Sequence, residues 1–396
     1  MSAVREVVVL GGVRTAIGDY GGALKDIAPT ELAGQVIREA VKRAKVDPQQ
    51  VNQLVFGNVI HTEPKDMYLS RVACIKGGLP QDTTALTVNR LCGSGLQAIV
   101  SAAQGIQLGD ADVAVGGGAE SMSRGGYLMP ALRSGQRMGD ASAIDMMVGA
   151  LTDPFDTVHM GITAENIADK WKITREQQDA FAVESHRRAL NAIDKGYFKD
   201  QILPVELKTR KGVTLFDRDE HARADISLES LAKLRAVFKK EGSVTAGNAS
   251  GINDGAAAIV MMERGAADKA GLKPMARLVS YGLAGVDPKI MGIGPVPACT
   301  RALAKAGLTV DQMDVIESNE AFAVQALAVS CDLKFDAAKT NPNGGAVSLG
   351  HPIGATGAIL TVKALYELQR TGGRYALVTM CIGGGQGIAA VFERMS

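Results

Sequence analysis

The sequence predicts an α/β protein built from two similar halves, with a highly charged segment between them. Three observations support this fold class. Short apolar runs alternate with amphipathic helical patterns, which is typical of βαβ units and a mostly parallel, buried sheet. The same order of patterns returns near the C-terminus. The composition between the two series changes sharply, to a mixture of positive and negative charge.

The first half is expected to alternate strands and helices. The predicted elements are a strand at 7–10, a helix at 29–44, a strand at 53–57, a helix at 94–108 and a strand at 112–115 that ends in three glycines. A further apolar run at 256–262 follows the charged segment and is expected to add one more strand to this half.

The second half repeats this order. Its predicted elements are a strand at 277–280, a helix at 297–306, a strand at 314–317, a helix at 354–369 and a strand at 375–381, which again ends in three glycines. The segment 40–58 also matches 302–319 in its order of helix end, strand and asparagine. We interpret this as an internal duplication of a unit of about 120 residues, too long for a solenoid repeat.

The segment between the halves is expected to be a folded insertion. Residues 169–241 hold 13 acidic and 16 basic residues, and 175–193 has a helical pattern. Mixed charge on helical stretches indicates solvated faces, not a disordered tail. Because the strand at 256–262 comes after this segment, we expect the insertion to lie within the first half and to cover the functional edge of the sheet.

Composition excludes several function classes. The chain has 396 residues, 46% of them hydrophobic and 21% charged, with a formal net charge of +1. Such a chain can bury a large core. No global field attracts nucleic acid or an anionic membrane, and aromatic residues, at 4%, are too few for single-strand stacking platforms.

The cysteines and the N-terminal sequence favour a reducing, cytoplasmic compartment. The five cysteines form no CxxC pair, which argues against a disulfide framework or a zinc ribbon. A strand pattern begins at residue 6, with no signal or transit pattern before it, and no apolar run is long enough to span a membrane.

Cys92 is the first candidate for chemistry. An apolar strand that reaches Val88 enters the turn around Gly93 and Gly95, and a helix begins at once. The N-terminal end of a helix favours a thiolate, and the glycines permit a tight turn and a close substrate approach. This arrangement is similar to a nucleophile elbow with cysteine in place of serine. A free cysteine is otherwise usually a small buried apolar residue.

His351 lies at the duplicate position of the Cys92 turn. The segment 341–357 contains five glycines and two prolines, which indicates a loop fixed against another surface. A lone histidine is more often structural. Because the two duplicated helix starts should converge at one edge of the sheet, we expect His351 to be a base opposite Cys92.

Two further candidates follow predicted strands. Cys381 stands at the end of the last strand, before Gly383, whose backbone N–H is expected to point at an oxyanion. One of the two cysteines would then be the nucleophile and the other an acid and base. Asn319 follows the strand at 314–317 and is expected to orient a water or an oxygen. The alternative for both is core packing beside a turn.

Familiar nucleotide and metal motifs are missing from the sequence. It contains no GxxxxGK[ST], HExxH, GxSxG or GxGxxG pattern. His61, His186 and His221 show no metal-ligand spacing and are predicted to be surface residues.

Together, NRLCGSGLQA, SNEAFA, LGHPIGATGA and CIGGGQG resemble the four signature blocks of the thiolases, over essentially the whole chain. The resemblance is strongest to the bacterial biosynthetic acetyl-CoA acetyltransferases and β-ketothiolases, including the polyhydroxyalkanoate branch. It implies two βαβαβαββ halves in a five-layer α-β-α-β-α core, with an inserted loop domain that binds coenzyme A. The implied domains are 1–120 with 250–272, the insertion 121–249, and 273–396.

The resemblance also implies residue roles. Cys92 accepts the acyl group, His351 activates it, Cys381 handles the α-proton of acetyl-CoA, and Asn319 holds a water that forms an oxyanion hole with His351. The N–H groups of Cys92 and Gly383 form a second hole. The implied coenzyme A and substrate contacts are His159, Met160, Arg223, Phe238, Ser250 and Phe322.

The implied reaction is a reversible Claisen condensation of two acyl-CoA molecules through an acyl-cysteine. Two acetyl-CoA molecules would give acetoacetyl-CoA and free coenzyme A, and we expect the enzyme to act on 3-ketovaleryl-CoA as well. Coenzyme A thioesters are the substrates and products, and we expect no metal or separate cofactor. The family also implies a homotetramer. From the composition, we expect neither nucleic acid nor a membrane as a partner.

Three alternatives remain open from the sequence. One is a degradative 3-ketoacyl-CoA thiolase of fatty-acid oxidation that takes longer chains. A second is a condensing enzyme of the ketoacyl-synthase type, which lacks the cysteine found here at Cys381. The third is a non-catalytic acyl-binding protein, which is expected to lack Cys92 or His351.

Overall fold

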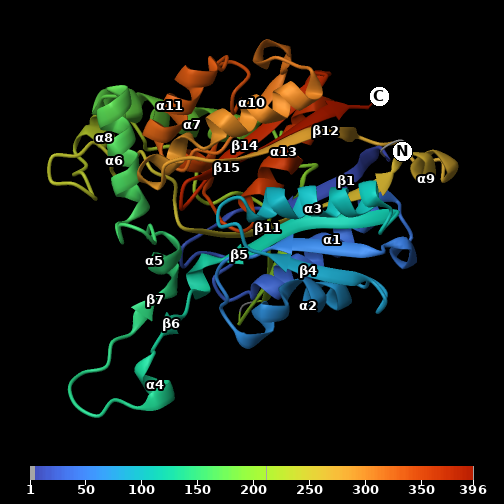
Figure 1. The fold of residues 1–396 in the computed structure, drawn as a ribbon, viewed down its shortest axis with the longest axis horizontal. Coiled ribbons are helices and arrows are strands. Elements are labelled where there is room, and N and C mark those ends of the chain that lie inside the picture. Colours follow the sequence, from blue (N-terminus) through green and yellow to red (C-terminus); the bar gives the residue numbers. More distant parts are fainter. Residues whose placement is uncertain (1–4, 211, 396) are drawn as a thin grey trace.

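The computed structural model describes residues 5–210 and 212–395, and its core is one mixed β-sheet with helices on both faces and between its two parts. The strand order is β13-β14-β15-β12-β1-β11-β5-β3-β4. Among the described residues, the two halves of the sheet pair where Val8 and Val9 of β1 lie beside Arg277 and Ala276 of β12. Each half otherwise forms its own part of the sheet. In Figure 1 the N-terminal half, blue to cyan, lies below the C-terminal half, orange to red.

The first half contains the predicted strands and helices together with the short elements β2, α2 and α9, which the sequence analysis did not predict. Its strands are β1 (Val7–Thr15), β2 (Gly18–Asp19), β3 (Gln53–Gly57), β4 (Thr84–Val88), β5 (Val113–Ser121) and β11 (Asn253–Glu263). Its helices are α1 (Pro29–Ala44), α2 (Leu69–Lys76), α3 (Ser94–Leu108) and α9 (Arg264–Lys269). Strand β11 lies between β1 and β5, so this sheet is completed by residues that follow the insertion.

The second half repeats this plan. Its strands are β12 (Ala276–Gly285), β13 (Val315–Ser318), β14 (Tyr375–Ile382) and β15 (Gln386–Arg394). Its helices are α10 (Pro295–Ala306), α11 (Ala323–Leu333), α12 (Ala346–Leu349) and α13 (Thr356–Thr371). Where the first half has β4, the second has a single parallel bridge between Ile316 and Thr340.

Helices α3 and α13 form the central layer. They pack against each other, α3 also contacts β5 and β15, and α13 also contacts β11 and β14. Helices α1 and α2 cover the outer face of the first sheet, and α10 covers the outer face of the second. The chain therefore has the five layers of the expected fold. Both central helices begin at the carboxyl ends of the strands that flank them, which brings their N-terminal turns together.

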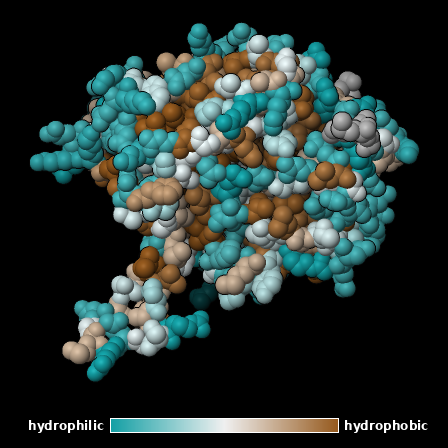
Figure 2. All heavy atoms as spheres, in the orientation of Figure 1, coloured by the Kyte–Doolittle hydropathy of each residue, from teal (hydrophilic) through white to brown (hydrophobic). Residues whose placement is uncertain are grey.

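The insertion consists of a projecting arm and a helical part. Its helices are α4 (Ala131–Ser134), α5 (Met146–Ala150), α6 (Met160–Trp171), α7 (Arg175–Asp194) and α8 (Leu228–Ala232), and its strands are β6 (Tyr127–Leu128), β7 (Ile144–Asp145), β8 (Ile202–Leu203), β9 (Val205–Thr209) and β10 (Gly212–Phe216). The arm, residues 125–145, extends away from the body in Figures 1 and 2. It exposes several large apolar side chains: Tyr127, Leu128, Met129, Leu132, Met138 and Ile144.

Two details of the sequence prediction are wrong: the expectation of a mostly parallel sheet, and the expectation that the strand at 112–115 ends where its three glycines begin. The sheet is mixed, because β11 and β15 run antiparallel to both of their neighbours; only β3 with β4, β3 with β5, β13 with β14 and β1 with β8 are parallel pairs. A hairpin turn at positive-φ Gly384 and Gly385 reverses the chain between β14 and β15. Gly116, Gly117 and Gly118, by contrast, do not form a turn and continue β5.

The glycines of β5 are needed for close packing. A Cβ on Gly118 would lie 2.2 Å from the carbonyl oxygen of Gly354, and a Cβ on Gly117 would lie 2.3 Å from that of Ala257. None of the helices in residues 5–210 and 212–395 is long and apolar enough to cross a membrane.

Candidate active site

The catalytic candidates surround one cavity of about 590 Å³ at the carboxyl ends of the strands. Nine of the predicted site residues line it: Cys92, His159, Met160, Phe238, Ser250, Phe322, His351, Cys381 and Gly383. They come from both halves and from the insertion. The cavity also has lining residues that the sequence did not single out: Asp19, Tyr20, Met122, Ala150, Leu151, His221, Val237, Thr245, Ala246, Ala249, Gly251, Ile252, Met291, Ala321 and Ile353.

Cys92 lies on a strained turn directly before α3. Leu91 has a φ of 45°, which is uncommon for a residue other than glycine. The hydroxyl of Ser94 holds the turn, since its oxygen accepts from the N–H of Arg90 at 2.8 Å and its O–H donates to the carbonyl of Leu91 at 2.7 Å. The expected elbow is thus present, and it directs Cys92 to the cavity.

The glycines that flank Cys92 permit close packing. A Cβ on Gly93 would lie 2.6 Å from Cδ1 of Ile382, and one on Gly95 would lie 2.8 Å from the backbone nitrogen of Ala358. Larger residues would push the start of α3 away from β14 and α13. These two glycines therefore let the cysteine turn lie against β14, which carries Cys381, and against the start of α13, five residues after His351.

Two opposing effects act on the Cys92 thiol in this turn. The apolar surroundings desolvate the thiol and raise the pKa of Cys92 to about 11. Hydrogen bonds from the backbone N–H groups of Gly383 and Cys92 itself favour the anion, but they are outweighed by desolvation. The raised pKa disfavours the thiolate, so attack by Cys92 needs a base that accepts its proton.

His351 is held with one ring nitrogen facing the catalytic groups. Its Nδ1 lies 2.7 Å from Oγ1 of Thr356, whose own hydroxyl donates to the carbonyl of Pro352 at 2.9 Å. The Thr356 oxygen therefore accepts from Nδ1–H, which leaves Nε2 unprotonated. Burial lowers the pKa of His351 to about 4, so the ring is neutral at pH 7 and can accept a proton at Nε2.

Asn319 and Cys381 complete the group. Nδ2 of Asn319 lies 3.5 Å from Nε2 of His351, and Oδ1 of Asn319 has no hydrogen-bond partner within the described part of the chain. Asn319 is fully buried behind the cavity lining. Cys381 is also buried, and both desolvation and the neighbouring Cys92 raise the pKa of its thiol.

An aromatic stack forms the wall contributed by the insertion. The rings of His159 and Phe238 are parallel with centroids 4.5 Å apart, and Phe238 meets Phe322 edge to face at 6.3 Å. Gly161 makes room for the stack, because a Cβ there would lie 2.2 Å from the Phe238 ring. Ser250 is fixed beside it by donating its N–H to the carbonyl of Ala321. This wall suits an elongated, partly apolar ligand.

Arg223 does not line the cavity. Its guanidinium is exposed and pairs with Asp225 at 3.1 Å. The backbone N–H of Arg223 donates to Nδ1 of His186, which fixes the segment on α7. Arg223 follows His221, a cavity-lining residue, by two positions in the sequence.

The prediction that His186 and His221 are surface residues is wrong. His186 is buried, and its pKa falls to about 4 because of desolvation. His221 lines the cavity mouth and contacts the carboxylate of Asp19, whose pKa it lowers. The mixed charge around both residues had suggested solvent exposure. Glu220, next to His221, instead accepts hydrogen bonds from the backbone N–H groups of Asp19 and Ala23, which fixes its segment against the first half.

Glu120 is a buried carboxylate that the sequence analysis missed. Its two oxygens accept from Nδ2 of Asn58 and from the N–H groups of Val59, Ile60 and Gly354, at 2.8–3.1 Å. Burial raises its pKa to about 8. It ties Gly354, which follows His351 in sequence, to the first half.

The duplication explains this position. Gly57 pairs with Gly118 in the first half, and Ser318 pairs with Thr379 in the second. By the same register, Asn58 and Glu120 occupy the places of Asn319 and Cys381. A comparison of the two halves residue by residue would have singled out Glu120.

Within the described residues, no group of three or more histidine, cysteine or acidic side chains is placed to hold a metal ion. The arrangement instead offers a nucleophilic thiol, a neutral imidazole, a second thiol and backbone N–H groups in one largely apolar cavity. These groups suit acyl transfer and proton abstraction next to a carbonyl.

Comparisons with known proteins agree with this geometry. Residues 7–265 match the family described as thiolase, N-terminal domain, and residues 272–394 match thiolase, C-terminal domain. The chain is 67% identical over 392 residues to the β-ketothiolase BktB of Cupriavidus necator, covering 99% of this chain and 100% of BktB. It is 50% identical to an acetyl-CoA acetyltransferase of Syntrophomonas wolfei, covering 99% and 100%.

A solved structure shows the same fold. The crystal structure of human mitochondrial 3-ketoacyl-CoA thiolase in complex with CoA superposes with a TM-score of 0.97 at 46% identity, and the match covers 100% of both chains.

Proposed function

The chain belongs to the thiolase family, and we infer from this membership that it is an acetyl-CoA C-acyltransferase of the β-ketothiolase type. It joins two acetyl-CoA molecules into acetoacetyl-CoA and coenzyme A, in a reversible Claisen condensation. The observation that carries the proposed mechanism is the convergence of Cys92, His351 and Cys381 on one cavity.

In the first half-reaction, Nε2 of His351 takes the proton of Cys92 as the thiolate attacks the thioester carbonyl of acetyl-CoA. The N–H groups of Cys92 and Gly383 stabilise the oxyanion. The bond to coenzyme A breaks, and the leaving thiolate takes the proton of Cys381. Acetyl-Cys92, protonated His351 and a Cys381 thiolate remain.

In the second half-reaction, the Cys381 thiolate removes an α-proton from a second acetyl-CoA. Its raised pKa makes it a strong base for a carbon acid. The enolate oxygen is held by His351 and by a water on Asn319, and its carbon attacks acetyl-Cys92. The bond to Cys92 breaks and the sulfur recovers its proton from His351, which restores the starting state.

Coenzyme A thioesters are the only ligands that this scheme needs. We place the pantetheine arm along His159, Met160, Phe238, Ser250 and Phe322, and a phosphate near Arg223. The apolar arm at 125–145 supports a homotetramer, and we assign the enzyme to the cytoplasm. Neither nucleic acid nor a membrane is proposed as a partner.

A series of 3-ketoacyl-CoA substrates tests the proposed chain length. We expect acetoacetyl-CoA and 3-ketovaleryl-CoA to be cleaved with similar kcat/KM, and the value to fall about tenfold or more at eight carbons, a penalty of about 1.4 kcal/mol. The reason is that Met160 and Phe322 wall the cavity, so added methylenes meet steric resistance in place of favourable burial. A kcat/KM that rises with chain length would instead identify a degradative enzyme.

Arg223→Ala is expected to raise the KM for acetyl-CoA several-fold with little change in kcat. The residue lies away from the reacting groups, so it contributes binding that is equal in the ground and transition states. The matched control is Arg218→Ala, which removes another exposed, ion-paired arginine of the same segment. Equal KM values for Arg223→Ala and the unmodified enzyme would remove Arg223 from the site.

A further inference from the structure

The loop before His351 contains a buried asparagine in a strained conformation. Asn341 is 3% exposed and has a φ of 45°. A left-handed backbone at a residue other than glycine persists when surrounding contacts hold it. The reaction scheme leaves this residue without a role.

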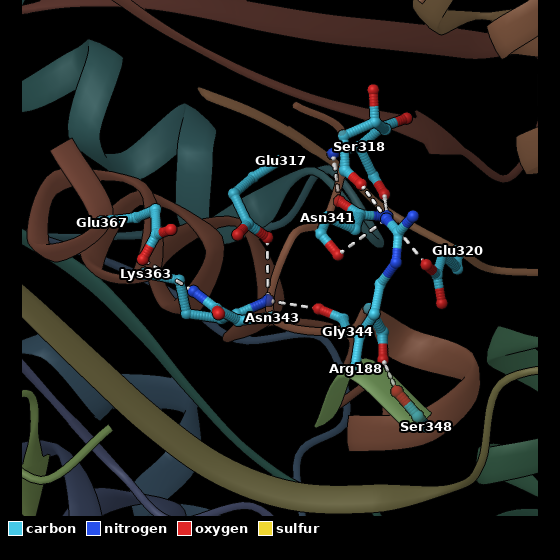
Figure 3. A network of polar contacts seen from close by, with 12 residues as sticks. Arg188, Glu317, Ser318, Glu320, Asn341, Asn343, Gly344, Ser348, Lys363 and Glu367 are labelled. Atoms are coloured by element: carbon cyan, nitrogen blue, oxygen red, sulfur yellow. Dashed lines mark hydrogen bonds and ion pairs between the residues drawn. The ribbon is translucent and has the colours of Figure 1, made fainter. Parts of the chain in front are cut away.

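The amide of Asn341 binds both sides of Asn319. Its Oδ1 accepts from the N–H of Ser318 at 2.9 Å, and its Nδ2 donates to the carbonyl of Ser318 and to Oε1 of Glu320, each at 2.8 Å. The residues before and after Asn319 are therefore fixed by one side chain from another loop (Figure 3).

Glu320 extends this hold to the segment that carries His351. Its Oε2 accepts from Oγ of Ser185 at 2.7 Å and from the N–H of Val347 at 3.1 Å. Val347 belongs to α12, which ends at Leu349, two residues before His351. Gly345 packs directly on the carboxylate, since a Cβ there would lie 2.2 Å from the carboxyl carbon.

We propose that Asn341 is a positioning residue that, through Ser318 and Glu320, sets the orientation of Asn319 toward His351 for enolate formation. This inference rests on the proposed function. Asn319 and His351 lie 3.5 Å apart at their nitrogens, and Asn319 itself makes few side-chain contacts that could fix it. Its orientation therefore depends on the backbone that Asn341 holds.

The proposal predicts an effect on one half-reaction. Enolate formation depends on Asn319 and His351 together, whereas acetylation of Cys92 uses His351 and the N–H groups of Cys92 and Gly383 but not Asn319. Loss of the Asn341 amide is expected to slow enolate formation and to leave the rate of Cys92 acetylation nearly unchanged. A general loss of packing would slow both.

Asn341→Gly is the suitable variant, because glycine adopts a positive φ without strain. The matched control is Asn343→Gly, which removes the same amide from the same loop. Asn343 is also buried, but its Nδ2 donates to Glu367, and it contacts neither Ser318 nor Glu320 (Figure 3).

Two rates are measured for each variant: acetylation of Cys92 by acetyl-CoA, by quenched-flow mass spectrometry, and exchange of the acetyl-CoA methyl protons with deuterated solvent. For Asn341→Gly we expect acetylation within about threefold of the unmodified enzyme and exchange slowed at least about tenfold, as for a misplaced oxyanion-hole donor. Asn343→Gly is expected to keep the ratio of the two rates.

Equal slowing of both rates in Asn341→Gly, no slowing of exchange, or the same change of ratio in Asn343→Gly would overturn the proposal. Measurements on the unmodified enzyme distinguish a failure of this proposal from a failure of the proposed function. If it neither acetylates Cys92 nor exchanges methyl protons, the reaction scheme itself is wrong.

Discussion

Cys92→Ser is expected to lower the rate of condensation by roughly 10³-fold or more, the largest effect of any single substitution considered for this enzyme. The cavity raises the pKa of the Cys92 thiol to about 11 and would disfavour ionisation of a serine hydroxyl far more strongly. An acyl-serine is also an ester, which is more stable than the thioester substrate. Transfer of the acyl group from serine to the enolate would therefore be less favourable than transfer from cysteine.

Peptide mass spectrometry after incubation with acetyl-CoA measures the intermediate directly. The acetyl mass is expected on the peptide that contains Cys92 and to be absent from that peptide in Cys92→Ser. Cys331→Ser is the control, because Cys331 is an exposed thiol away from the cavity. An acetyl group found only on Cys381 would reverse the roles of the two cysteines.

Cys381→Ser is expected to lower condensation by about 10²- to 10⁴-fold, the range for loss of a general acid and base. A serine hydroxyl is a much weaker acid than a thiol and would not be deprotonated by the leaving coenzyme A. Acetylation of Cys92 is expected to continue, since its nucleophile, His351 and its oxyanion hole remain.

The comparison of acetylation with methyl-proton exchange separates these functions. In Cys381→Ser, Cys92 is expected to become acetylated while exchange of the acetyl-CoA methyl protons with deuterated solvent is largely lost. Cys299→Ser serves as the matched control, because Cys299 is another buried thiol of the second half that does not line the cavity. Exchange at the unmodified rate in Cys381→Ser would identify a different base.

The sequence predicted the elements whose ends are marked by local chemistry. Helix α1 begins at Pro29 and ends before Lys45 in a left-handed conformation, and its predicted bounds match those of the structure. Helix α3 likewise begins after the glycine turn at Gly93 and ends at Leu108, directly before left-handed Gly109. Strand pairing was harder to predict, because β11 and β15 are apolar runs whose direction depends on tertiary contacts and on the hairpin at Gly384.

The catalytic side chains were predictable because they stand beside glycines in short, distinctive segments. His221 and Asp19 were not, since their meeting depends on contacts between segments some 200 positions apart. Glu120 was missed because it stands near the end of a glycine-rich strand with no motif around it. Asn341 was noted only as part of the His351 loop, and no role was predicted for it. A buried hydrogen-bond partner on another element leaves no local pattern in the sequence.

The position of β11 has a consequence for synthesis of the chain. Strands β1 and β5 emerge from the ribosome early, but the strand that lies between them starts at Asn253, after a long insertion. At about 5–20 residues per second, the roughly 130 residues between β5 and β11 take about 7–26 s to be made. During that interval β1 and β5 expose unpaired edges of apolar strands, the kind of surface that chaperones bind and that aggregates when left uncovered. The nascent chain therefore passes through a vulnerable stage set by its topology, which ends only when translation supplies the missing central strand.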